Sequence, residues 1–134
     1  MSLLNSLTHV NFLAVVVAGI SHMVVSLVWF QPWLFGRAWV ALTKQELKPA
    51  VRWLVPGFLG HLLIALALAA LIVVTNATVP GALLVAVIVW LCFIVTLELG
   101  ELIWEKIPVK LFLIRIGNHL VALCLASLIL GIWR

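Results

Sequence analysis

The sequence predicts an all-α fold: an integral membrane bundle of four antiparallel helices, with a short interfacial helix between the first two. Apolar residues make up 66% of its 134 residues and charged residues only 9%, whereas an ordinary soluble domain carries roughly 25% charged residues. The apolar residues also gather in four long runs. So few charges could not cover a soluble protein, and we therefore expect lipid to surround most of the chain.

Each apolar run is long enough to cross a bilayer once as a helix. A helix rises ~1.5 Å per residue and the hydrocarbon core is ~30 Å thick, so about 20 residues are enough. Unpaired backbone amides are costly in lipid, and the alternating pattern of a barrel strand is absent. We expect one transmembrane domain over residues 1–134, with spans at residues 10–30, 53–74, 82–103 and 111–133.

The connections between the spans contain helix breakers and one capping signal. Pro32 is expected to end the first span, and Pro108 to separate the third from the fourth. Residues 76–81 are expected to form a tight turn. Thr43 is followed three positions later by Glu46, which fits a capping box. The short interfacial helix is therefore expected to begin near Thr43.

Basic residues predict the orientation of the bundle, because cytoplasmic connections are enriched in Lys and Arg. Residues 31–52 and 105–110, with their flanks, hold seven of the eight Lys and Arg residues, and the opposite side holds only Arg134. Both connections are expected in the cytoplasm and both termini outside. The net charge of +4 is explained in this way without nucleic acid as a partner. The seven residues are Arg37, Lys44, Lys48, Arg52, Lys106, Lys110 and Arg115.

Several tryptophans fall where the predicted spans meet the cytoplasmic surface. Trp and Tyr are enriched at membrane interfaces, where one end of the ring is apolar and the other is wet. We expect an interfacial belt made of Trp29, Trp33, Trp39, Trp53 and Trp104.

Polar residues inside the spans are the candidate site. An ionisable group in a span costs at least ~2.5 kcal/mol, so each needs a physical reason. One such group per span lies about 9 to 12 Å from the cytoplasmic end, at ~1.5 Å per residue. The histidines stand on stripes of small residues, which mark the faces where membrane helices pack. The predicted polar core comprises His22, His61, Glu98, Glu101, Arg115, Asn118 and His119.

Three interpretations of this polar layer remain open from the sequence. It could be a structural network in which Arg115 pairs with Glu98 or Glu101 and the histidines bond between helices. It could be a proton or cation path, because the pKa values of buried His and Glu can cross neutral pH. It could also bind a transition metal through His22, His61, His119 and Glu98, or haem between two histidines.

No motif in the sequence singles out an enzyme. The serines lack a GxSxG elbow or an acid–base arrangement around them, and there is no Gly-rich phosphate loop. The residues therefore favour a protein that is not an enzyme.

Two stretches resemble a family of small bacterial membrane proteins classed as a domain of unknown function. Residues 28–39, Val-Trp-Phe-Gln-Pro-Trp-Leu-Phe-Gly-Arg-Ala-Trp, resemble the family's Trp-Tyr-Ser-Pro-x-x-Phe-Gly-x-x-Trp pattern at the end of the first span. Residues 104–114, followed by Gly117, His119 and Leu120, resemble its junction between the third and fourth spans. The resemblance covers nearly the whole chain and implies four spans in a bacterial inner membrane, with the activity left open.

The chain departs from the pattern of this family at the polar positions. Glu98 and Glu101 stand where the family tends to carry asparagine, and Arg115 where asparagine is expected. The paired changes fit an intramembrane ion pair. Phe30 and Gln31 also replace the family's Tyr and Ser.

The sequence leads to three functional hypotheses. The first is a transporter or channel for protons, cations or a small solute, built on the His/Glu layer. The second is a metal- or haem-binding membrane protein, and the third is a non-catalytic accessory subunit of a larger membrane complex. Because the bundle is small, we expect it to form a homo-oligomer or to bind a partner subunit in the bilayer.

Overall fold

The computed structural model describes residues 2–47 and 50–134, which form helices and no strand. By length and composition, four helical segments could cross a membrane: Phe12–Trp29, Val51–Val74, Val79–Glu105 and Val109–Ile132. The chain is thus an all-α membrane bundle, as the sequence predicts. The expected spans differ from these bounds by at most three residues at either end. Lys48, which was counted for the orientation, lies outside the described residues.

The first and last long helices, α2 (Phe12–Trp29) and α7 (Val109–Ile132), are regular. The Asn11 side chain accepts a hydrogen bond from the Ala14 amide at 3.1 Å, which satisfies one of the free amides at the start of α2. Pro108, in an extended conformation, directly precedes α7 and, as a proline, adds no amide hydrogen of its own at this end. Before α2 lies α1 (Leu3–Leu7), a short helix that the sequence analysis missed.

The third spanning segment is one continuous helix with two widened stretches. It consists of α5 (Val79–Val89), η3 (Trp90–Val95), α6 (Thr96–Gly100) and η4 (Glu101–Glu105), where the η segments are π-helical. Pro80 stands in the first turn of α5, where a proline costs no hydrogen bond, so this helix begins three residues before the expected span.

The short helix between the first two spans exists but does not begin at Thr43. After the kinked η1 (Pro32–Gly36), α3 (Arg37–Thr43) ends at Thr43, and Lys44 takes the left-handed conformation with φ of 59°. The Thr43 hydroxyl donates to the Trp39 carbonyl at 2.8 Å. The capping-box prediction was therefore wrong in its position, because this threonine bonds back into its own last turn.

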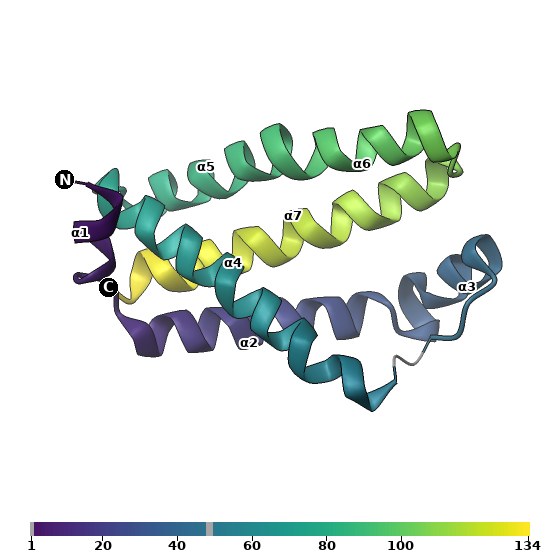
Figure 1. Ribbon diagram of the computed structural model, residues 1–134, viewed down its shortest axis with the longest axis horizontal. Helices are drawn as coiled ribbons and strands as arrows, with labels where there is room; N and C mark the ends of the chain where they lie inside the picture. The colour runs from purple at the N-terminus through teal and green to yellow at the C-terminus, as the bar shows by residue number, and fades with distance from the viewer. Residues whose placement is uncertain (1, 48–49) are drawn as a thin grey trace.

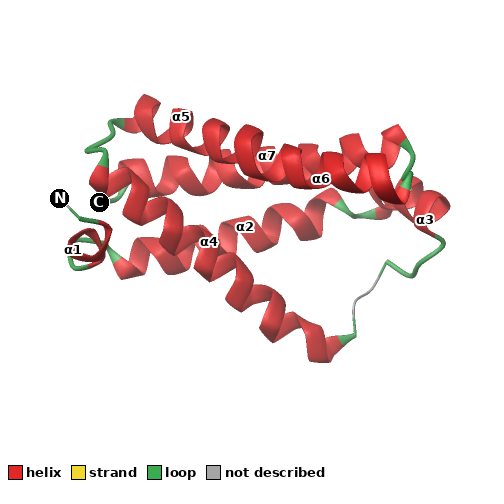
Figure 2. Ribbon diagram, turned by 45° about the horizontal axis from the view of Figure 1, so that its top comes forward, coloured by secondary structure: helices red, strands yellow, loops and turns green. Residues whose placement is uncertain are grey.

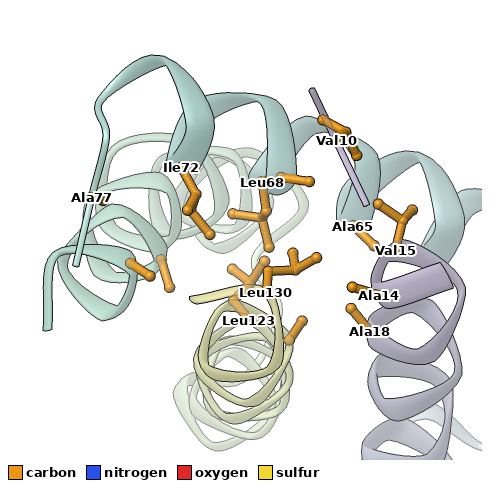
Figure 3. Packing of buried hydrophobic residues seen from close by; sticks show 14 residues of the cluster. Val10, Ala14, Val15, Ala18, Ala65, Leu68, Ile72, Ala77, Leu123 and Leu130 are labelled. Carbon is orange, nitrogen blue, oxygen red and sulfur yellow. The ribbon is translucent and has the colours of Figure 1, made fainter. Parts of the chain in front are cut away.

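The helices α2, α4 (Leu54–Val74), α5 and α7 pack together at the end of the bundle where both termini lie, which we name the terminal end (Figure 1). Helix α7 contacts each of the other three. Figure 3 shows the core there, with Leu68, Ile72, Leu123 and Leu130 filling the space between small residues. These small residues are Ala14, Ala18, Ala65, Ala69, Ala77, Ala82, Ala86 and Ala126.

At the opposite end, which we name the loop end, α4 diverges from α2 (Figures 1 and 2). Residues 51–57, which comprise η2 (Val51–Trp53) and the first turn of α4, are exposed. The bundle is thus tightly packed at the terminal end and open between α2 and α4 at the loop end.

Candidate functional site

Three histidines from three different helices meet in the middle of the bundle. The ring centroids of His22 on α2 and His61 on α4 are 4.6 Å apart, and those of His22 and His119 on α7 are 6.5 Å apart. His22 is in the centre, with only 1% of its surface exposed. We name these three residues the histidine cluster. Proximity of these side chains was expected from their similar depths along the spans.

Small neighbours explain why the histidines turn inward. One turn before His22, Ala18 is fully buried, and one turn after His61, Ala65 is fully buried. Small side chains let two helices approach closely, so a polar residue on the same stripe points at the neighbouring helix and away from lipid.

The ring nitrogens of the cluster are not used up by hydrogen bonds. Among residues 2–47 and 50–134, both nitrogens of His22 and Nδ1 of His61 are buried and have no hydrogen-bond partner. A buried polar atom without a partner costs roughly 1 to 3 kcal/mol. These three nitrogens can accept or release a proton, and they form no hydrogen bond with the described residues.

An ion pair between two helices lies next to the cluster. The Arg115 guanidinium on α7 bonds the carboxylate of Glu98 on α6 at 3.5 Å and that of Glu101 at the start of η4. Because Arg115 precedes His119 by four residues on the same helix, both side chains share one face of α7. The pairing anticipated from the sequence is therefore present, and it involves both glutamates.

Asn118, the last of the seven predicted polar residues, bonds to a serine of α2. Asn118 Nδ2 donates to the hydroxyl of Ser26 at 3.3 Å, which ties α7 to α2 one turn beyond His22. Asn118 is buried, and its Oδ1 has no partner within the described part of the chain. All seven predicted polar residues therefore lie in or beside one layer of the bundle.

A cavity of about 630 Å³ opens between α2, α4 and the loop that connects them. Its inner end reaches His61 and Ser26, and most of its wall is apolar. This cavity could not be predicted from the sequence, because it depends on the angle at which α4 leaves α2. It is lined by Met23, Ser26, Leu27, Phe30, Gln31, Pro32, Trp39, Gln45, Glu46, Leu47, Trp53, Leu54, Gly57, Phe58 and His61.

Two tryptophans hold α7 in place from either side. Trp29 Nε1 donates to the Ile114 carbonyl at 3.0 Å, and Trp90 Nε1 donates to the Ile116 carbonyl at 2.7 Å. A helical carbonyl has a second lone pair for such a bond. Sequence reasoning did not single out Trp90, because a tryptophan in an apolar run gives no sign of its acceptor.

The five tryptophans of the expected belt differ in their exposure. Trp33, Trp53 and Trp104 are 72%, 59% and 84% exposed, and Trp39 is partly buried. Trp29 instead stacks on Phe35 at 4.5 Å and lies against α7. Its N–H has an acceptor inside the bundle, the Ile114 carbonyl.

The widened stretches η3 and η4 flank the helix that carries Glu98. Stretches of π-helix are rare and recur at functional sites, where they turn side chains out of regular register. Here they place Trp90 against α7, and Glu98 and Glu101 around Arg115.

The arrangement gives little support to the metal interpretation. Across residues 2–47 and 50–134, no group of three or more His, Cys, Asp or Glu residues is placed to hold a metal ion. A haem plane does not fit between His22 and His61 either, because rings 4.6 Å apart already touch.

One family model matches residues 13–131, nearly the whole chain. It is described as a protein of unknown function, DUF1761. The chain belongs to this family. No curated protein and no solved structure matches the chain. Membership names no activity, so the function of this DUF1761 protein must be argued from the polar layer itself.

Proposed function

We propose that this DUF1761 protein is a small membrane transporter or channel that moves protons, or a small cation or solute coupled to them, through the histidine cluster. The observation that carries the proposal is the close approach of three histidines from three helices inside the bundle, where both nitrogens of the central His22 have no partner among residues 2–47 and 50–134. A neutral imidazole can accept a proton on one nitrogen and release one from the other, which suits a relay.

The cavity supports a path into the cluster from the loop end. It reaches His61, which contacts His22 directly, and His22 in turn faces His119. A proton entering through the cavity would therefore meet the three rings in sequence. In the orientation that the basic residues predict, this mouth faces the cytoplasm.

The neighbouring charges favour a positive species in this layer. Two carboxylates share one guanidinium, so the formal charges of Glu98, Glu101 and Arg115 sum to −1. In a low-dielectric environment an unbalanced negative charge attracts a proton or cation strongly. Arg115 and His119 share one face of α7, so this charge stands beside the histidine cluster.

The terminal end would be the closed side of such a transporter. The alanine-rich core seals the bundle between the histidine cluster and the termini. Passage to that side requires the helices to separate there, as in alternating access.

Proton flux in proteoliposomes tests the proposal. Purified protein is reconstituted with a pH-sensitive dye inside the vesicles, and a potassium diffusion potential drives protons inward. We expect the wild type to acidify the lumen faster than protein-free vesicles, and His119→Ala to lose this activity. His9→Ala removes an exposed histidine near the terminal end and is the matched control, with flux unchanged. Wild-type flux equal to that of empty vesicles, or full flux in His119→Ala, would contradict the proposal.

A further inference from the structure

The cavity between α2 and α4 has the size and walls of a binding site for a small molecule. Ligand sites commonly enclose about 300 to 1,000 Å³ and are apolar, with a few polar groups that orient the ligand. This cavity measures about 630 Å³, and its polar groups lie at its inner end and its mouth. A ligand that fills it must carry a substantial apolar part.

Four aromatic side chains stand in the wall: Phe30, Trp39, Trp53 and Phe58. The faces of aromatic rings carry negative potential and attract cations. The Trp53 ring already interacts in this way with the chain itself, because the Arg52 guanidinium carbon lies 5.6 Å from its centroid, and Phe30, Trp39 and Phe58 are left for a ligand. Such rings favour an organic cation over an anion.

The polar groups of the cavity point to the same chemistry. Among the described lining residues, Glu46 is the only one with a formal charge, and that charge is negative. The cavity is also lined by His61, whose imidazole can accept a hydrogen bond when unprotonated. An ammonium group supplies N–H donors for it.

We propose that the cavity binds a lipophilic organic ammonium ion, with its apolar part against the aromatic wall and its N–H group directed at His61. The inference rests on the proposed function in one respect, since it names the substrate class of the same transporter. An ammonium bound at His61 would stand next to the proton path, because His61 touches His22.

Two glycines of α4 provide a matched pair of variants. Gly57 lines the cavity, and a Cβ built on it meets no atom within 4 Å. Gly60 has the same open surroundings but does not line the cavity. A leucine at either position clashes with nothing near its Cβ, but only Gly57→Leu fills the cavity. Equal melting temperatures of the two variants would show that both fold.

Three probes with the same naphthyl ring but different charges show which kind of ligand the cavity prefers. Naphthylmethylammonium, naphthylmethanol and naphthylacetate carry a positive, a neutral and a negative group, and their binding to purified protein is measured by calorimetry in detergent. We expect the ammonium to bind about tenfold more tightly than the alcohol, which corresponds to about 1.4 kcal/mol and lies between the values for exposed and desolvated cation–π contacts. Gly57→Leu should lose this binding, and Gly60→Leu should keep it.

Other outcomes decide against the inference. Preference for the carboxylate, or equal binding of all three probes that Gly57→Leu leaves unchanged, would identify the cavity as an anion site or as a groove for lipid chains. Loss of ammonium binding with intact proton flux would overturn only the substrate class. Tight, Gly57-dependent ammonium binding in a protein without proton flux would support the site and overturn the relay.

Discussion

Arg115 is the residue on which the charge balance of the polar layer depends. It bonds two carboxylates, Glu98 and Glu101, on the neighbouring helix. The sequence made this pairing predictable, because three ionisable residues within two adjacent spans must neutralise one another in lipid. It could not show that one guanidinium serves both carboxylates, since this depends on the widened turns around α6.

Removal of Arg115 is expected to destabilise the protein. Arg115→Leu leaves two carboxylates side by side without a counter-ion, and breaking a buried pair from one side costs up to about 3 to 5 kcal/mol. Because the three side chains are only partly buried, we expect about 1 to 3 kcal/mol. The loss would appear as a lower melting temperature in detergent.

A compensated variant separates charge from packing in this experiment. The triple variant Arg115→Leu, Glu98→Gln and Glu101→Gln removes all three charges together, and it should recover most of the lost stability. If the triple variant melts as low as Arg115→Leu alone, the guanidinium matters for its packing and the ion-pair account is wrong.

At the scale of elements, the contact between α2 and α7 depends on one tryptophan and one glycine. Trp29 lies across Gly117, where an added Cβ would stand 3.0 Å from Cζ2 of the indole. The indole cannot retreat easily, because its N–H is bonded to the Ile114 carbonyl. The helices themselves were predictable from their apolar runs, but this contact requires knowing which faces meet.

Gly117→Ala is therefore expected to destabilise the bundle although it improves helix propensity. Overpacking a close contact costs typically about 1 to 3 kcal/mol. We expect the thermal midpoint to fall in Gly117→Ala and to hold or rise in Gly100→Ala, the control, where an added Cβ meets nothing within 4 Å.

The partner of this clash can be tested in the same way. Trp29→Phe removes the ring atoms nearest Gly117, so the double variant Trp29→Phe, Gly117→Ala should be less destabilised than the sum of the two single variants. Additive effects would mean that the alanine is harmful for a reason other than the indole.

At the scale of the whole molecule, composition and periodicity predicted the architecture. The cavity at the candidate site depends on the angle between two helices, which they did not predict. The four spans and the common depth of the polar residues follow from residue counts and the rise of a helix. The divergence of α4 from α2, and hence the cavity at His61, does not follow, because apolar runs of similar length leave the crossing angle open. The terminal end is closed because its alanines let the helices pack closely, and these alanines can be identified in the sequence.

The whole-molecule account places a proton relay at the centre of the bundle, and His22 is its central residue. If His22 has a structural role, its replacement should lower the melting temperature. If it is a relay residue, its replacement should lower proton flux instead. With both nitrogens unpaired in the described structure, His22 contributes no hydrogen bond that leucine would lose. Leucine in its place removes buried polar atoms and can be accommodated with little cost in stability.

The most direct measurement is therefore proton flux and thermal stability of His22→Leu, recorded on the same purified sample beside the wild type. The account predicts a melting temperature equal to or above that of the wild type, together with proton flux reduced at least about tenfold, since one imidazole of the relay is gone. A stable His22→Leu protein that carries protons at the wild-type rate would contradict the central claim.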